Sequence, residues 1–330
     1  MRENNNRNHT NRDQKRKNKL IYLIIVLVAA VALTVAEYIT TMNEDDKAAS
    51  EVSSAFDSAY ESAQIIEEAD KNDGIAVHYI DVGQGDCSLI VCGEYTVLID
   101  AGERGNEDNV IEYLYSYGID ELDYVVATHP HSDHVGSLDE VIETFRVKNV
   151  IMPRLTEVNT PSNSIYSDLL KAVKASKAKV IAAKAGNEYV LGNAVMTVLG
   201  PVYQNDNLNN MSVVVRIDYG ESSFLFQGDA EIDEENDILE TGADIDCDVL
   251  KVGHHGSYTS SSANYLKKVT PEIAVISCGV DNDYDHPHDK PLKRIRKHTE
   301  KIYRTDLCSD IVIISDGETY EIDYANREMD

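Results

Sequence analysis

The chain has 330 residues, enough for one domain of roughly 250 residues with additional segments. It holds 30 basic and 58 acidic residues, a net charge of −28 at pH 7. Seven basic and two acidic residues lie within positions 1–19, so the remainder has 23 basic and 56 acidic residues, a net charge of −33. This balance excludes a domain-wide basic surface of the kind that captures nucleic acid through its phosphates.

An uncharged run from Leu20 to Ala36 follows the basic N-terminal tail. Extended to Ile39 across one glutamate, it reaches the length of a membrane-spanning helix. Its basic flank predicts a cytoplasmic N-terminus, with the rest of the chain outside the cytoplasm. We therefore expect a basic tail over 1–19 and a single transmembrane helix over 20–39 at the cell membrane. The alternative is a signal peptide whose cleavage releases a secreted protein.

Residues 40–73 are acidic and rich in alanine and serine, with apolar residues at helical spacing. We expect a helical stalk here, which either pairs with a second stalk in a homodimer or packs on its own domain. The globular domain is expected over 74–324, followed by a short tail over 325–330. The five cysteines include no C-x-x-C pair, and no disulfide is predicted.

Apolar periodicity in the globular domain predicts strands interspersed with helices. Strands are expected at 75–82, 87–92, 95–100, 123–128, 149–153, 179–183, 188–191, 194–199, 211–219, 222–227, 247–252, 272–277, 301–304 and 310–323. Helices are expected at 106–118, 137–145, 164–176, 233–241, 261–268 and 290–298. Several strands are apolar throughout, so we expect an α/β fold in which helices cover both sides of packed sheets.

The segment Thr128-His129-Pro130-His131-Ser132-Asp133-His134 joins a predicted strand to a predicted helix. It brings three imidazoles and one carboxylate within six residues, a combination that suits Zn, Mn or Fe better than Ca or Mg. His129 and His131, two residues apart, can point to one metal ion. Asp133 and His134 can turn toward a second ion. A histidine-rich surface loop is the alternative interpretation.

Seven of the ten histidines fall into three groups, 129/131/134, 254/255 and 286/288, each in a predicted loop near a strand end. A later strand ends in Gly228-Asp229, where a carboxylate can bridge two cations, although Gly-Asp is also a common turn. Lys251 directly precedes the second histidine group, and we expect it to be solvated. Four serines are expected to be loop or helix-start residues and not nucleophiles: Ser257, Ser260, Ser261 and Ser262.

The H-x-H-x-D-H segment, with Ile99-Asp100-Ala-Gly102 upstream and Gly-Asp downstream, resembles the metallo-β-lactamase-fold hydrolases. Four further motifs resemble, more narrowly, the hydrolase domain of the competence protein ComEC/Rec2: Asp81-Val-Gly-Gln-Gly-Asp86, Gly253-His-His-Gly-Ser257, Asn282-x-Tyr-x-His-Pro287 and Tyr303-Arg-Thr-Asp306. The resemblance covers about 74–324. It implies an αββα metallo-β-lactamase-like sandwich, here preceded by one N-terminal transmembrane helix.

The resemblance also implies two divalent metal ions, Zn or Mn. His129 and His131 would hold the first ion, and Asp229 would bridge to the second. The second ion would be held by Asp133, His134 and one of His254 and His255. Supporting roles fall to Asp81, Asp86, Asp100, Asn210 and Ser212, with Asp100 orienting the metal loop.

One departure from the family pattern concerns the first ion. The wider family has another histidine between the metal loop and Gly-Asp, whereas this chain has none from Val135 to Asp229. The corresponding stretch is Asn209-Asn210-Met-Ser212. The first ion would then be bound by His129, His131 and Asp229, with Asn210 or Ser212 nearby. We expect this to weaken the site or to change its metal.

The implied reaction is hydrolysis by hydroxide from a water that two cations share. Asp133 would be needed for catalysis, and His286 and His288 would protonate a leaving group or contact phosphate. The expected function is that of a membrane-anchored extracytoplasmic phosphodiesterase, with DNA as one candidate substrate. A basic cluster near the last predicted helix is either a binding patch or a solvated surface: Lys290, Lys293, Arg294, Arg296, Lys297, Lys301 and Arg304.

Two alternative functions remain open at this point. The first is cleavage of a cell-wall phosphodiester, as carried out by the teichoic-acid phosphorylcholine esterases of this fold. The second is a non-catalytic, membrane-anchored binding protein that retains the same fold.

Overall fold

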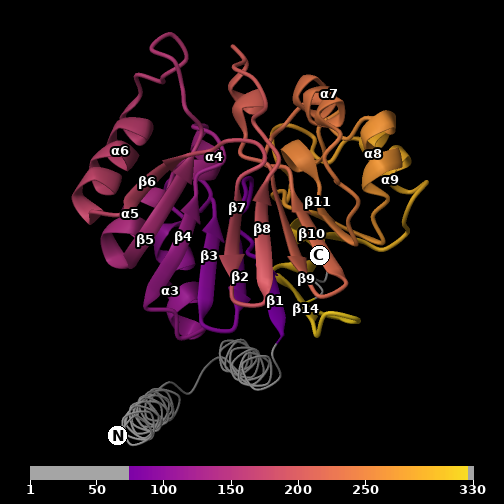
Figure 1. Cartoon of the computed structure of the whole chain (residues 1–330), viewed down its shortest axis with the longest axis horizontal. Helices are drawn as coiled ribbons and strands as arrows, with labels where there is room; N and C mark the ends of the chain where they lie inside the picture. The colour runs from indigo at the N-terminus through magenta and orange to yellow at the C-terminus, as the bar shows by residue number, and fades with distance from the viewer. Residues whose placement is uncertain (1–73, 326–330) are drawn as a thin grey trace, which may run out of the picture. The chain divides into compact units, whose positions relative to one another are not determined.

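The computed structural model describes residues 74–325, which form two β-sheets and the helices around them (Figure 1). The first sheet has the strand order β15-β14-β1-β2-β3-β4-β5-β6. Its strands are Ile75–Tyr79 (β1), Ser88–Cys92 (β2), Tyr95–Ile99 (β3), Glu121–Val126 (β4), Arg146–Met152 (β5), Lys179–Ala182 (β6), Ile311–Ser315 (β14) and Tyr320–Tyr324 (β15).

The second sheet has the strand order β13-β12-β11-β10-β9-β8-β7. Its strands are Glu188–Leu191 (β7), Ala194–Val198 (β8), Val215–Tyr219 (β9), Ser222–Phe226 (β10), Val249–Lys251 (β11), Ile273–Ile276 (β12) and Ile302–Arg304 (β13).

Helices and helical turns connect the strands. The α-helices are Glu107–Ser116 (α3), Ser132–Val135 (α4), Leu138–Thr144 (α5), Ser164–Ser176 (α6), Ile232–Thr241 (α7), Ala263–Val269 (α8), Asp289–Ile295 (α9) and Thr305–Cys308 (α10). Two 3₁₀ turns span Leu208–Met211 (η1) and Gly253–Gly256 (η2).

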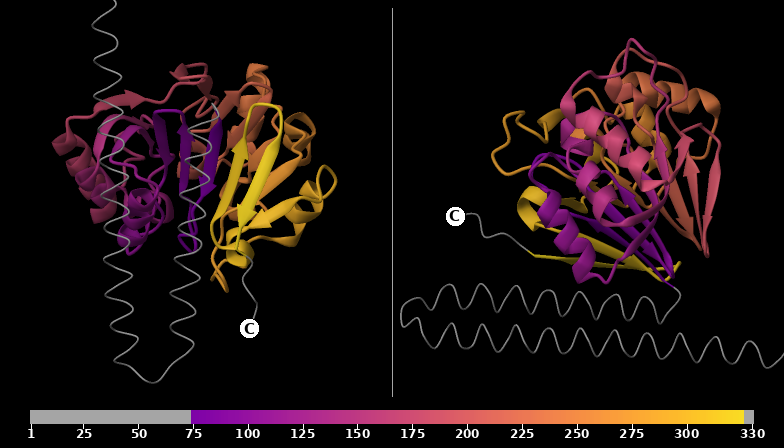
Figure 2. Two further views of the ribbon diagram at one scale, coloured as in Figure 1. Left: turned by 90° about the horizontal axis from the view of Figure 1, so that it is seen from below. Right: turned by 90° about the vertical axis from the view of Figure 1, so that its left-hand side faces the viewer.

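Three apolar clusters define a four-layer arrangement. One cluster lies between the two sheets and draws residues from strands of both. A second packs α3, α5 and α6 on the outer face of the first sheet, and a third packs α7, α8 and α9 on the outer face of the second. These two helix sets lie on opposite sides of the sheets in Figures 1 and 2. The expected αββα sandwich is therefore the observed architecture.

Strand β10 illustrates how the sequence produces these layers. Phe224 and Phe226 belong to the cluster between the sheets, whereas Leu225 belongs to the cluster under the helices. Alternate residues of a strand point to opposite faces, so a strand covered on both faces needs apolar residues at consecutive positions.

Parallel pairing places several strand ends at one edge. In the first sheet β3, β4 and β5 run parallel, and in the second sheet β10, β11 and β12 do so. The loops that follow parallel strands meet at the same edge of a sheet, where α/β proteins commonly bind ligands. The predicted metal loop follows β4, and α4 lies at the upper end of this strand in Figure 1.

Most predicted elements occur within a few residues of their expected positions, but two expectations were wrong. The strand expected over 310–323 is a hairpin of β14 and β15, because the Asp316 carboxylate accepts backbone N–H groups of Glu318 and Thr319 and closes a turn. The strand expected from 211 begins only at Val215, because η1 extends to Met211 and residues 212–214 have no regular secondary structure.

Several sequence predictions concern residues outside the described range. The basic tail, the transmembrane span and the stalk all precede residue 74, and the predicted C-terminal tail is described only at Ala325. Among the helices of residues 74–325, none has the length and apolar character needed to cross a membrane.

Candidate metal centre

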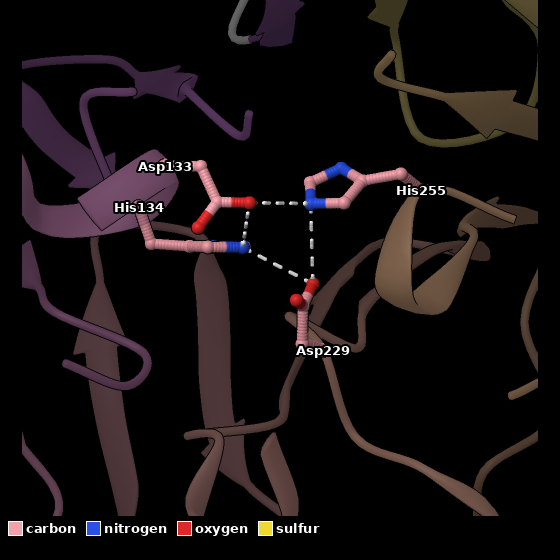
Figure 3. A group of neighbouring side chains, drawn as sticks. All are labelled: Asp133, His134, Asp229 and His255. Carbon is pink, nitrogen blue, oxygen red and sulfur yellow. Dashed lines mark ion pairs between the residues drawn. The ribbon is translucent and has the colours of Figure 1, made fainter. Parts of the chain in front are cut away.

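Four side chains converge at the strand ends of the two sheets (Figure 3). His134 and Asp133 come from α4, Asp229 follows β10, and His255 follows β11. His134 Nε2 lies 3.1 Å from Asp229 Oδ1, and His255 Nε2 lies 3.5 Å from this oxygen and 3.3 Å from Asp133 Oδ2. Ligand atoms of all four residues lie within 4.8 Å of one another. We call these residues the second-ion group.

The first-ion group consists of His129, His131 and Asp229. His129 Nε2 lies 3.0 Å from His131 Nδ1 and 3.7 Å from Asp229 Oδ2. Asp229 is thus common to both groups, with Oδ1 toward one and Oδ2 toward the other. Two groups that share a carboxylate fit a pair of divalent cations.

Buried polar atoms without hydrogen bonds support a metal at this position. His134 Nε2, His255 Nε2 and Asp229 Oδ1 are buried and form no hydrogen bond, although the two nitrogens lie 3.1 and 3.5 Å from the oxygen as ion pairs. Buried polar atoms without hydrogen bonds are costly in a folded protein, and a cation between them would satisfy all three. Imidazole nitrogen and carboxylate oxygen are also the donors that Zn and Mn accept.

Oxygen atoms behind the rings fix their orientation. Asp100 Oδ2 lies 2.8 Å from His134 Nδ1, and Asp100 accepts both the backbone N–H and the hydroxyl of Thr128. His129 Nδ1 lies 3.1 Å from the Thr128 hydroxyl and 3.3 Å from the Ser212 hydroxyl. These contacts leave each Nε2 directed at the centre, the arrangement expected of metal-binding histidines.

We expected the Lys251 side chain to be solvated, and this expectation was wrong, because the side chain is buried. It is 1% exposed, and its Nζ lies 2.9 Å from both oxygens of Asp86 and 3.1 Å from the Val252 carbonyl oxygen. Asp86 Oδ1 in turn lies 3.2 Å from His255 Nδ1, which also faces the Ser277 carbonyl oxygen at 3.0 Å. Lys251 therefore balances the buried carboxylate that helps to orient His255.

The carboxylates of the centre oppose the effect of burial on the pKa values of His134 and His255. Burial opposes protonation of His134, but Asp229 and two further carboxylates outweigh it and raise the His134 pKa well above its usual value. Burial also opposes protonation of His255, whose pKa the carboxylates of Asp229 and Asp86 raise to about 10. In contrast, burial and the charge of His134 lower the pKa of His129 well below its usual value. The carboxylates thus favour positive charge at this centre.

The segment from Asp81 to Asp86 contacts the backbone of the loop that carries Asp133. The backbone N–H of Asp86 donates to the Asp133 carbonyl oxygen, and the Asp81 carboxylate closes a turn by accepting the Gly83 N–H. Gly85 has φ +151°, and a Cβ there would lie 2.3 Å from the Asp133 carbonyl oxygen. This close approach requires glycine. Asp81 therefore shapes the loop and is not one of the converging side chains.

A histidine rim lies beside the two groups. The His286 ring is 5.9 Å from that of His255 and 5.6 Å from that of His254, and His288 is 4.9 Å from His286. Two exposed tyrosines flank this rim: Tyr284 stacks on His286, and Tyr258 meets His288 edge-on. The rim places His286 next to the centre and His288 one ring further away.

The remaining predicted residues have identifiable contacts. Asn210 accepts the backbone N–H of Glu231, and the Ser212 hydroxyl accepts the backbone N–H of Asp229 in addition to its contact with His129. Ser262 caps α8 by accepting the Tyr265 N–H, as expected of a helix-start residue.

Sequence reasoning missed the roles of Lys251, whose side chain pairs with Asp86, and of Glu231, whose carboxylate contacts His254. The burial of Lys251 could have been predicted from its position at the end of an apolar strand. No sequence pattern indicated the role of Glu231, because an acidic residue in a loop is common.

The chain belongs to the metallo-β-lactamase superfamily, whose family model matches residues 80–280. It is 30% identical to ComE operon protein 3 of Bacillus subtilis (strain 168) over 249 residues, 70% of this chain and 32% of the relative. It is also 30% identical to Recombination protein 2 of Haemophilus influenzae over 261 residues, 77% of this chain and 30% of the relative. The chain thus spans about a third of the length of these relatives, and the expected resemblance to ComEC/Rec2 is confirmed.

The crystal structure of the metallo-β-lactamase fold protein YhfI from Bacillus subtilis has a similar fold. It superposes with a TM-score of 0.51 over 74% of this chain and 100% of YhfI, at 15% identity. This similarity supports the fold assignment.

Proposed function

We propose that this protein is a metal-dependent phosphodiesterase. The observation that carries the proposal is the convergence of four side chains, those of Asp133, His134, Asp229 and His255. Three of their potential metal-ligand atoms are buried and form no hydrogen bond. The first-ion group joins this set through Asp229, so the donors suit two divalent cations, Zn or Mn. His129 and His131 would hold the first ion, and Asp133, His134 and His255 the second.

Bound cations of this kind lower the pKa of a water molecule and stabilise charge that develops on a phosphoryl oxygen. The protein's own residues prepare the site for this chemistry. Asp100 and Thr128 hold His134, and Lys251 with Asp86 holds His255, so the rings are oriented before substrate binds. No serine nucleophile is needed in this scheme.

His286 is suited to contact the substrate as a neutral hydrogen-bond donor. Gln84 Oε1 accepts the Gly279 N–H, which turns Nε2 of the same amide toward His286 Nδ1 at 3.5 Å. The His286 proton then resides on Nε2. Burial and the neighbouring charges of His255 and His254 lower the His286 pKa to about 4, so the ring is neutral at pH 7. This favours contact with a phosphate oxygen over protonation of a leaving group.

Nucleic acid is one candidate substrate, and the relatives named Recombination protein 2 and Competence protein ComA are consistent with it. Charge favours a second candidate, a cell-wall phosphodiester that carries phosphorylcholine, because its choline group is a cation. The basic cluster is partly engaged within the protein, because Arg294 donates to the Ser260 carbonyl oxygen and Arg304 pairs with Asp306. The loop carrying His286 exposes Asp281, Asp283 and Asp285, and Asp289 is exposed at the start of α9.

The proposal includes a membrane tether, with the catalytic domain outside the cytoplasm. Its support is the apolar run over 20–39 and the basic residues that precede it. This part of the proposal is separate from the metal chemistry.

Metal content and hydrolysis, measured on full-length protein, test the proposed function. We expect about two metal ions per chain and hydrolysis of bis(p-nitrophenyl) phosphate, single-stranded DNA or a teichoic-acid polymer. Asp133→Ala should reduce the rate at least about 100-fold, whereas Asp323→Ala, at an exposed position of β15, should not change it. Protein that binds two ions but cleaves none of these substrates would contradict the proposal and favour a binding protein.

A further inference from the structure

The adjacent residues His254 and His255 direct their rings to different oxygens of Asp229. His255 Nε2 lies 3.5 Å from Oδ1, the oxygen that faces the second-ion group. His254 Nε2 lies 3.6 Å from Oδ2, and His129 Nε2 lies 3.7 Å from the same Oδ2. His254 therefore stands on the side of the first-ion group.

An unusual backbone conformation separates the two rings. His254 has φ 50° and His255 has φ 52°, both in the left-handed region. This region is strained for non-glycine residues, which adopt it only where surrounding contacts enforce it. The contacts here include the His254 N–H with the Gly228 carbonyl oxygen at 3.0 Å and the Ser257 N–H with the His254 carbonyl oxygen at 2.7 Å.

The contacts of His254 Nδ1 match those of a metal-binding histidine. Nδ1 lies 3.3 Å from Glu231 Oε1 and 3.0 Å from the Thr259 hydroxyl. A proton on Nδ1 directed at the carboxylate leaves the Nε2 lone pair facing Asp229, as Asp100 does for His134. The His288 ring lacks this arrangement, because its Nδ1 accepts a hydrogen bond from the Tyr258 backbone N–H instead of directing a proton at a carboxylate.

Glu231 also connects His254 to the stretch that lacks a histidine. Its Oε1 accepts from Asn209 Nδ2 at 3.2 Å, and its backbone N–H donates to Asn210 Oδ1 at 2.9 Å. The asparagines of this stretch are thereby engaged with Glu231. His254 lies beside them with a nitrogen directed at the shared carboxylate.

We propose that His254 supplies the third imidazole of the first metal ion, together with His129, His131 and Asp229. The adjacent histidines would thus serve different ions, His254 the first and His255 the second. Ligand atoms of a tetrahedral Zn site lie about 3.4 Å apart, close to the 3.6 Å between His254 Nε2 and Asp229 Oδ2. His254 is not a member of the first-ion group as the structure has it, so the assignment requires its ring to move toward His129 and His131 when the ion binds. The inference rests on the proposed metal-dependent function.

Zinc titration of metal-free, full-length protein against a chelating indicator tests this assignment. Wild type is expected to bind two ions, and His254→Ala to weaken one site at least about 100-fold, more than loss of an orienting contact would. His129→Ala should weaken the same site. The variant that carries both His129→Ala and His254→Ala should therefore bind the first ion only slightly more weakly than either single variant. The variant lacking both His254 and His255 should lose both sites. His298→Ala, at an exposed position after α9, is the matched control.

Circular dichroism and thermal unfolding establish that each variant is folded. Should His254→Ala fail to fold, Glu231→Gln keeps the side-chain size and is expected to weaken the same site about 10–100-fold. Two zinc ions bound with wild-type affinity by a folded variant would overturn the inference, as would a wild-type protein that binds only one ion. Two sites with the expected pattern but no diester hydrolysis would reject the proposed function and leave the assignment of His254 supported.

Discussion

Replacing Lys251 with methionine removes one partner of a buried ion pair and leaves the other in place. Lys251 is 1% and Asp86 5% exposed, and Nζ lies 2.9 Å from both carboxylate oxygens. Methionine fills a similar volume but cannot balance the charge. Asp86 would then keep a buried carboxylate whose neighbouring positive group is the His255 ring.

The expected loss follows from the desolvation of the remaining charge. Removing one partner of a buried ion pair costs about 3–5 kcal/mol when the other charge stays buried without compensation. The His255 ring still faces Asp86, so we expect a loss toward the lower end of this range. Removing both charges is less harmful, so Asp86→Asn in the Lys251→Met background should recover about 1–3 kcal/mol. With an m-value of about 3 kcal/mol/M, the single variant should unfold at about 1–2 M lower urea.

Urea unfolding of full-length protein, followed by circular dichroism in the presence of a chelator, measures this loss without a contribution from metal binding. Lys267→Met on α8 is the matched control, because Lys267 is exposed and its loss should change stability by less than about 0.5 kcal/mol. A Lys251→Met variant within about 1 kcal/mol of wild type would refute the reasoning. The same conclusion would follow if the double variant were less stable than Lys251→Met.

Two further predictions concern Asp100 and Glu234. Asp100→Asn should weaken metal binding about 10–100-fold, because Asp100 orients His134; chelator competition measures this, and an unchanged affinity would contradict the role. Burial raises the Glu234 pKa to about 8. Between pH 4.5 and pH 8 the folded state therefore keeps a proton that the unfolded state has released. The free energy of unfolding falls as the pH rises through this interval, by up to about 1.4 kcal/mol per pH unit. Glu234→Gln should flatten this decline in urea unfolding at pH 5.5 and 8, and an equally steep decline would exclude the effect.

Assigning His254 and His255 to different ions has a consequence for the first site. With His254 included, the first ion has three imidazoles and a carboxylate available, the number of protein ligands that a tetrahedral site requires. The expected weakening of this site, which followed from the missing histidine in the stretch before Asp229, would then be offset by a residue that comes after it.

Local pattern determined much of the fold. Helix α6 spans Ser164–Ser176, as its apolar spacing and the capping Asn163 indicate, and β7 spans Glu188–Leu191. Such elements are specified by residues close in the chain, so their periodicity is sufficient evidence. The β14–β15 hairpin was within reach of the same reasoning, because Asp316-Gly317 is a turn dipeptide.

The sequence by itself also determined the chemistry of the centre, since clustered histidines, a Gly-Asp after a strand and the motif order indicated two groups of donors. Only the tertiary structure decided how His254 and His255 divide, because two successive left-handed residues direct their rings to opposite oxygens of Asp229. It also decided the burial of Lys251, which depends on Asp86, 165 positions away. Backbone conformation at such positions and contacts between distant segments follow from packing of the two sheets, which no local pattern encodes.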